Sequence, residues 1–134
     1  MSDRTTVVFL DANILVKPVT RTLLMAGGLP SGFRALWSLA AEHEAARHMR
    51  PPAVTPSFVR ERLGLRLSPT GAGAARFRAT KGADRQILAD AIAAQAGFLV
   101  TEDVDDFAVE DLVGVGISAV NPDLFLTARL TRDA

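Results

Sequence analysis

Val7-Val8-Phe9-Leu10-Asp11-Ala12-Asn13 lies near one end of the chain, and Phe98-Leu99-Val100-Thr101-Glu102-Asp103 follows the same plan near the other. In each stretch a short run of β-favouring apolar residues gives way to acidic and polar residues. Such runs are typical of strands buried on both faces of a parallel sheet, and ligands bind beyond the carboxyl ends of these strands. If the two strands are neighbours, we expect their acids to meet at one edge of the sheet.

Carboxylates crowded together repel one another unless a cation joins them, and a set of oxygen ligands selects a hard ion such as Mg²⁺ or Mn²⁺. The chain has no cysteine and only two histidines. Disulfides and thiolate metal sites are therefore excluded, and an imidazole-built zinc centre is disfavoured. The sequence indicates a metal-dependent hydrolase whose ligands are carboxylates.

Length and hydropathy favour one globular domain over residues 1–134. The chain has 134 residues, of which 49% are hydrophobic, and no linker divides it. This is enough for a substantial core. No apolar stretch approaches the roughly 20 residues of a membrane span, and residues 1–10 are too short and too polar at their start for a signal peptide. We expect a cytoplasmic protein that does not bind membranes.

The formal net charge of +0 conceals an uneven distribution, because Lys and Arg outnumber Asp and Glu in residues 1–80 and the reverse holds in residues 81–134. Guanidinium groups match phosphate geometry, so the arginine-rich part is a plausible track for a nucleic-acid backbone. The candidate contacts are Arg47, Arg50, Arg60 and Arg62. A solvated arginine-rich surface, or a docking face for an acidic partner protein, explains the same pattern.

Apolar periodicity, capping residues and helix-stopping residues predict alternating strands and helices. We expect strands at 7–10, 33–37, 98–100 and 117–120, and helices at about 20–26, 39–49, 56–63, 83–96 and 122–129. Ser38 and Asn121 are expected helix caps, and residues 64–73 form a loop rich in Gly, Ser and Pro. This order predicts an α/β sandwich around a parallel sheet.

Four segments carry a resemblance to a known family: Phe9–Asn13, Leu36–Ser38 with Glu42, His43 and Glu44 after it, Asp84–Ala91, and Val100–Phe107. In this order they resemble the PIN domain, the ribonuclease fold of VapC-type toxins from toxin–antitoxin pairs. The last two segments are the most specific, whereas residues 51–81 match poorly. The resemblance implies a three-layer α/β/α sandwich with a central parallel sheet.

The resemblance also implies the site. The metal-binding and catalytic acids fall on Asp11, Glu44, Asp84 and Asp106, Asp103 stands where the family has Asn or Asp, and Asn13 and Thr101 fall on supporting positions. The implied reaction is Mg²⁺- or Mn²⁺-dependent hydrolysis of RNA that leaves a 5′-phosphate and a 3′-hydroxyl. A homodimer, and an antitoxin whose tail blocks the groove, follow by the same analogy.

Two other functions stay open. One is a PIN-like protein that binds RNA or a partner without cutting. The other is a haloacid-dehalogenase-type phosphatase, which is disfavoured because Asn13 stands where that family normally has a second Asp acting as an acid.

Structural roles compete with the catalytic ones at several positions. Asp11 has no obvious local partner, and burying an unpaired carboxylate is costly, so a ligand role is favoured there. Asn13 is also a possible cap of the first helix, and Asp84 is a possible N-cap of the helix that follows it. Glu42 lies two positions from Glu44 and therefore points elsewhere on the helix.

The remaining polar residues receive less weight as ligands. Asp105 is expected to be exposed. Asp90 follows Asp84 by six residues, nearly on the opposite side of the helix, and is interpreted as a surface or supporting residue. His43 and His48 are interpreted as helix-surface residues rather than catalytic bases.

Overall fold

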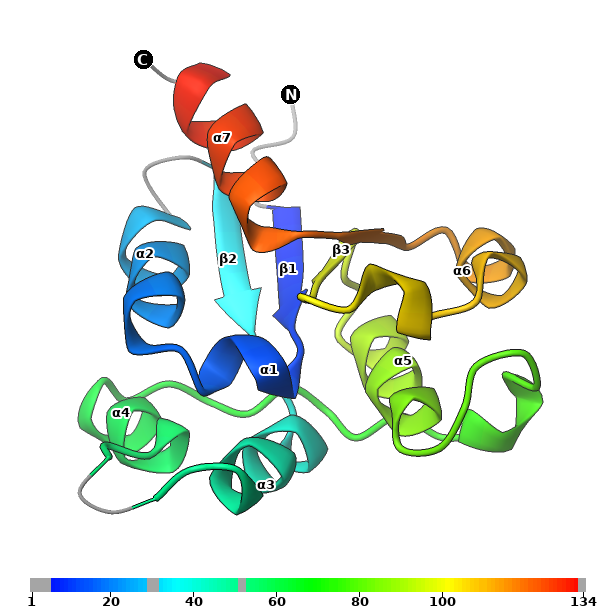
Figure 1. The fold of residues 1–134 in the computed structure, drawn as a ribbon, viewed down its shortest axis with the longest axis horizontal. Coiled ribbons are helices and arrows are strands. Elements are labelled where there is room, and N and C mark those ends of the chain that lie inside the picture. Colours follow the sequence, from blue (N-terminus) through cyan, green and yellow to red (C-terminus); the bar gives the residue numbers. More distant parts are fainter. Residues whose placement is uncertain (1–5, 29–31, 51–52, 133–134) are drawn as a thin grey trace.

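A four-stranded sheet whose strands are all parallel forms the centre of the protein (Figure 1). The structure is a computed structural model and describes residues 6–28, 32–50 and 53–132. The strands are β1 (Thr6–Leu10), β2 (Phe33–Leu36), β3 (Phe98–Val100) and β4 (Ser118–Val120), in the spatial order β2-β1-β3-β4. The predicted α/β class and its parallel sheet are confirmed.

The register of the two central strands places the predicted polar segments together. Phe9 pairs with Leu99 and Leu10 with Val100, so β1 and β3 end at the same level. Asp11 donates its backbone N–H to the carbonyl of Val100 at 3.0 Å. The two acid-bearing segments therefore leave the sheet side by side, as the sequence predicts.

Seven α-helices and two short 3₁₀ turns connect and cover the strands within the described ranges. They are α1 (Ala12–Leu15), α2 (Pro18–Gly28), α3 (Leu39–Arg47), α4 (Pro56–Arg62), η2 (Ala74–Arg76), α5 (Asp84–Ala93), η3 (Val104–Asp106), α6 (Val109–Val115) and α7 (Pro122–Arg132). The five predicted helices are all present, with ends displaced by a few residues. Four elements were not predicted, because such short helices contain too few turns to show a period: α1, α6 and both 3₁₀ turns.

Local capping explains several helix starts. The Ser38 hydroxyl accepts a hydrogen bond from the backbone N–H of Ala41 at 3.3 Å, and Thr55 does the same for Phe58 at 3.3 Å. Asn121 Oδ1 accepts from the N–H of Asp123 at 2.8 Å. These bonds satisfy donors that have no partner in the first helical turn. The predicted capping roles of Ser38 and Asn121 are confirmed.

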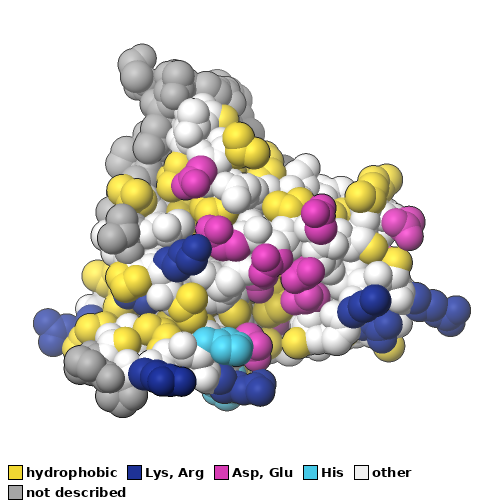
Figure 2. All heavy atoms as spheres, in the orientation of Figure 1, with side chains coloured by type: hydrophobic (Ala, Val, Ile, Leu, Met, Phe, Trp, Pro, Cys, Tyr) yellow, Lys and Arg dark blue, Asp and Glu magenta, His cyan; other side chains and the backbone are white. Residues whose placement is uncertain are grey.

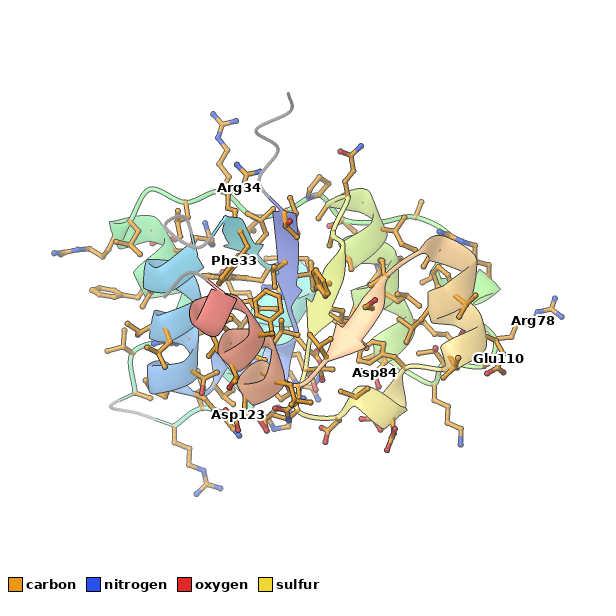
Figure 3. All side chains as sticks on the ribbon, turned by 90° about the horizontal axis from the view of Figure 1, so that it is seen from above. Phe33, Arg34, Arg78, Asp84, Glu110 and Asp123 are labelled. Carbon is orange, nitrogen blue, oxygen red and sulfur yellow. The ribbon has the colours of Figure 1, made fainter. Side chains whose placement is uncertain are left out.

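Helices lie on both sides of the sheet, with α5 and α7 on opposite sides when the molecule is seen from above (Figure 3). On α7, Phe125 packs edge-on against Phe33 of β2, with ring centroids 4.9 Å apart, and tilted against Phe98 of β3 at 5.4 Å. On α5, Ile87, Leu88 and Ala91 are buried. None of the helices in the described ranges has the length and apolar character needed to cross a membrane.

Candidate functional site

A pocket of about 260 Å³ opens at the carboxyl ends of the central strands. Its lining contains all five acids predicted as metal ligands: Asp11, Glu44, Asp84, Asp103 and Asp106. These acids come from the end of β1, from α3, from α5 and from the segment after β3. Figure 2 shows acidic side chains gathered in the middle of this face, with basic side chains and histidine towards its lower edge.

Asp11 is held by two short hydrogen bonds. It is the N-cap of α1, where Oδ1 accepts from the N–H of Ala12 at 2.7 Å, and Oδ2 accepts from the hydroxyl of Thr101 at 2.8 Å. The expectation that Asp11 has no local partner is therefore wrong. Burial raises the pKa of Asp11, the two hydrogen bonds oppose this, and the charges of Asp103 and Asp106 raise it further, leaving the pKa above its ordinary value.

Asn13 joins α1 to the segment after β3. Its Nδ2 donates to Thr101 Oγ1 and to Asp103 Oδ2, each at 3.2 Å, and its Oδ1 accepts from the N–H of Glu102 at 3.2 Å. Asn13 lies inside α1, so it does not cap a helix. Thr101 is fully buried and also accepts from the N–H of Asp103 at 3.1 Å. Asn13 and Thr101 thus orient acids at the pocket, as a supporting role requires.

The pKa of Asp84 reflects repulsion from the other four acids of the pocket. This residue is the first of α5, and the N-cap is Ala83, so the capping role considered for Asp84 is wrong. Burial, and after it the charges of Asp11, Asp106, Asp103 and Glu44, together raise the pKa of Asp84 to about 6. Carboxylates that repel one another in this way form a region that attracts a cation.

Glu44 is turned partly towards basic neighbours. Its Oε2 accepts from Arg47 Nη1 at 3.1 Å, and its Oε1 lies 3.2 Å from Nε2 of His48. His48 is exposed on the helix surface, as predicted, but it also lines the pocket. This second property of His48 was not predicted. The only hint was the spacing of four residues between Glu44 and His48, which places both on one helix face.

No group of three or more His, Cys, Asp or Glu side chains within the described ranges is arranged so that it could hold a metal ion. Two of the five acids are engaged by other side chains. Glu44 is drawn towards Arg47 and His48, Asp103 is held by Asn13, and the acids repel one another. The chemistry of the five acids still fits a hard divalent cation, because all five offer carboxylate oxygens as ligands.

The other acids considered from the sequence lie elsewhere. Glu42 is buried and accepts from Trp37 Nε1 at 2.9 Å and from Arg60 at 2.7 and 3.0 Å. The prediction that Glu44, and not Glu42, faces the pocket is confirmed. Asp105 is exposed, as expected.

Asp90 is fully buried, so the surface alternative of its interpretation is wrong and the supporting alternative stays open. Its Oδ1 accepts from the backbone N–H of Gly71 and from Nε2 of Gln86, each at 2.7 Å. It therefore fastens the loop around Gly71 to α5, the helix that carries Asp84.

The four arginines predicted to contact RNA divide into two pairs. Arg47 binds Glu44 at the pocket, and Arg50 lines an adjoining cavity. Arg60 forms an ion pair with Glu42 at 2.7 Å, and Arg62 lies over the ring of Phe58 at 5.8 Å. Arg60 is thus already paired with an acid, and RNA binding by these four arginines stays a prediction.

In comparisons with known proteins, the chain matches no protein-family model and no curated protein sequence.

Proposed function

We propose that the protein is a divalent-metal-dependent endoribonuclease with a PIN-like, three-layer α/β/α fold. The observation that supports this most is the pocket in which four other carboxylates help to raise the pKa of Asp84 to about 6. Mutual repulsion among so many acids lowers the stability of the folded protein, and a purely structural role would not offset this cost. A role in binding Mg²⁺ or Mn²⁺ accounts for them, because the cation cancels the repulsion.

In this proposal Asp11, Glu44, Asp84 and Asp106 hold the cation, and Asp103 contributes a further oxygen. When bound, Mg²⁺ or Mn²⁺ supplies charge neutralisation for the scissile phosphate and a more acidic water molecule. Thr101 keeps Asp11 oriented through its hydroxyl, and Asn13 keeps Asp103 in place. Glu44 also joins this set to two basic groups, Arg47 and His48, whose charge suits a phosphate.

The resemblance to VapC-type nucleases extends the proposal to the biological role. We propose that the protein is the toxin of a toxin–antitoxin pair, acts as a homodimer in the cytoplasm and is inhibited by an antitoxin. These proposals rest on the four matching segments and not on the pocket. A short reading frame beside the gene that encodes a DNA-binding antitoxin would support them.

Cleavage of end-labelled RNA by the purified protein tests the nuclease. We expect cleavage with Mn²⁺ or Mg²⁺, none with EDTA, and products with 5′-phosphate and 3′-hydroxyl ends. Asp11→Asn should abolish cleavage, whereas Glu110→Gln should not, because Glu110 is exposed in the first turn of α6 and does not line the pocket. Full activity of folded Asp11→Asn would remove this residue from the mechanism.

The second candidate is a PIN-like protein that binds RNA without cutting it. The lack of a preformed metal site among the described residues favours this candidate. Calorimetric titration with Mn²⁺ separates the two. Saturable Mn²⁺ binding that Asp84→Asn weakens supports the nuclease, whereas RNA binding without any Mn²⁺ binding supports the second candidate.

A further inference from the structure

A second cavity, of about 590 Å³, adjoins the acidic pocket. The two share Val16 and His48 in their walls. Three of the residues that line the second cavity are basic types, Arg21, His48 and Arg50, and none is acidic. A cavity that carries basic side chains among apolar ones therefore lies directly beside one with acidic walls.

Arg21 is the unusual member of this cavity. It comes from α2 and is only 4% exposed. Its Nη1 donates to the backbone carbonyl of Leu15 at 2.9 Å, and no acidic side chain within the described ranges forms an ion pair with it. Burial lowers the pKa of Arg21 below its ordinary value. Burying an unpaired cation costs free energy, and a bound anion would remove this cost.

A structural role explains only part of this arrangement. Leu15 is the last residue of α1, and a basic side chain near the end of a helix binds the free carbonyl groups there. One neutral donor is enough for one carbonyl group. That bond uses one guanidinium donor, and the positive charge has no acidic partner among the residues that the structure describes. A phosphate would supply the missing negative charge, and it accepts paired hydrogen bonds from arginine.

We propose that this cavity binds a phosphate group of the nucleic acid, with Arg21 and Arg50 as its ligands. The inference rests on the proposed function, because it places this phosphate next to the one held at the acidic pocket. His48 stands between the two sites and contacts Glu44. Val16 and Met49 line the same cavity and offer apolar surface to the adjoining sugar or base. The cavity thereby sets the position of the strand relative to the cutting site.

The test is a titration followed by nitrogen-15 NMR of the arginine Nε–H groups, in EDTA so that nothing is cleaved. The probes are inorganic phosphate, uridine 5′-monophosphate and the dinucleotide uridylyl-uridine, with chloride at equal ionic strength as the control. We expect saturable shifts of the Arg21 and Arg50 signals with phosphate and none with chloride. Binding of the dinucleotide identifies a phosphate within the strand, and binding of the monoesters alone identifies a terminal phosphate.

Substitutions test whether phosphate binds at this cavity. Arg21→Gln removes the charge and keeps a polar side chain, and we expect it to weaken phosphate binding about tenfold or more. Arg21→Lys should retain part of the binding. Arg50→Gln changes an exposed residue and remains informative if Arg21→Gln does not fold. The matched control is Arg78→Gln, because Arg78 projects from the far end of the molecule (Figure 3).

Unchanged phosphate binding in Arg21→Gln and Arg50→Gln, or shifts that do not saturate, would overturn the inference. The failure of the two proposals can be told apart. An active nuclease without phosphate binding at this cavity contradicts the cavity alone, whereas phosphate binding by a protein that never cuts RNA contradicts the nuclease alone.

Discussion

Replacing Asp84 by Asn should stabilise the protein when no divalent cation is present. Asp84 has a pKa of about 6, well above its ordinary value of 3.8, because burial and four neighbouring acids disfavour its charged form. Asn has nearly the same shape and carries no charge. The variant therefore removes the repulsion in the acidic pocket while leaving the packing of α5 in place.

The size of the effect follows from the pKa shift. A shift from 3.8 to about 6 corresponds to an upper limit of about 3 kcal/mol, since one pKa unit is worth ~1.4 kcal/mol. Asp84 is partly exposed, so solvent screening reduces this to roughly half. A negative charge at the start of α5 also stabilises the helix by about 0.5 kcal/mol, which the variant loses. We expect a net gain of about 1 kcal/mol, or ~3 °C in Tm.

The two pKa values of Asp84, folded and unfolded, give the direction in which stability changes with pH. Between pH 3.8 and about 6 the folded protein binds more protons at Asp84 than the unfolded chain does, so wild-type stability falls as pH rises through this window. Below it, both states are protonated and the variant has no advantage. Above this pH window, Asp84→Asn has its full gain in stability over the wild type.

Thermal unfolding of both proteins in EDTA across this range measures the effect. Glu110→Gln is the matched control, because Glu110 is also an acid in the first turn of a helix but lies outside the pocket. If Asp84→Asn is no more stable than the wild type above pH 7, the repulsion on which the metal-site argument rests is absent.

Two further predictions concern the support of the pocket. Thr101→Val removes the hydroxyl that donates to Asp11. We expect the free energy of unfolding, measured in urea, to fall by about 1–3 kcal/mol, and Thr101→Ser to recover most of this loss. An unchanged urea midpoint in Thr101→Val would contradict the prediction. Gly71→Ala would place a methyl group against the carbonyl oxygen of Ala89, where backbone must move, and should cost about 1–3 kcal/mol in the same assay. Gly114→Ala meets open space in α6 and should instead be neutral or stabilising, so equal effects of the two alanines would refute the steric argument.

Local patterns were sufficient to predict most of the fold. The four strands and five of the helices follow from apolar periodicity and from caps such as Ser38, because these signals act over a few residues. The short helix α1 has no such signal. Because α1 was not predicted, Asp11 was expected to have no local partner, whereas it is the N-cap of this helix.

The sequence also predicted which acids meet. Neighbouring parallel strands end at one edge of a sheet, which brings Asp11 and the acids after β3 together, and the family resemblance selected Glu44 and Asp84. Their chemistry as oxygen ligands is a property of the residue types alone.

The sequence by itself thus determined the α/β fold and the acidic character of the site. Only the tertiary structure decided that Asp90 is buried, that Glu42 neutralises Arg60, and that Arg21 lies buried without an acidic partner among the described residues. Each of these depends on contacts between elements that are separate in the chain. Periodicity and capping report the conformation of one segment, whereas the charge state and accessibility of a side chain depend on which distant segment packs against it.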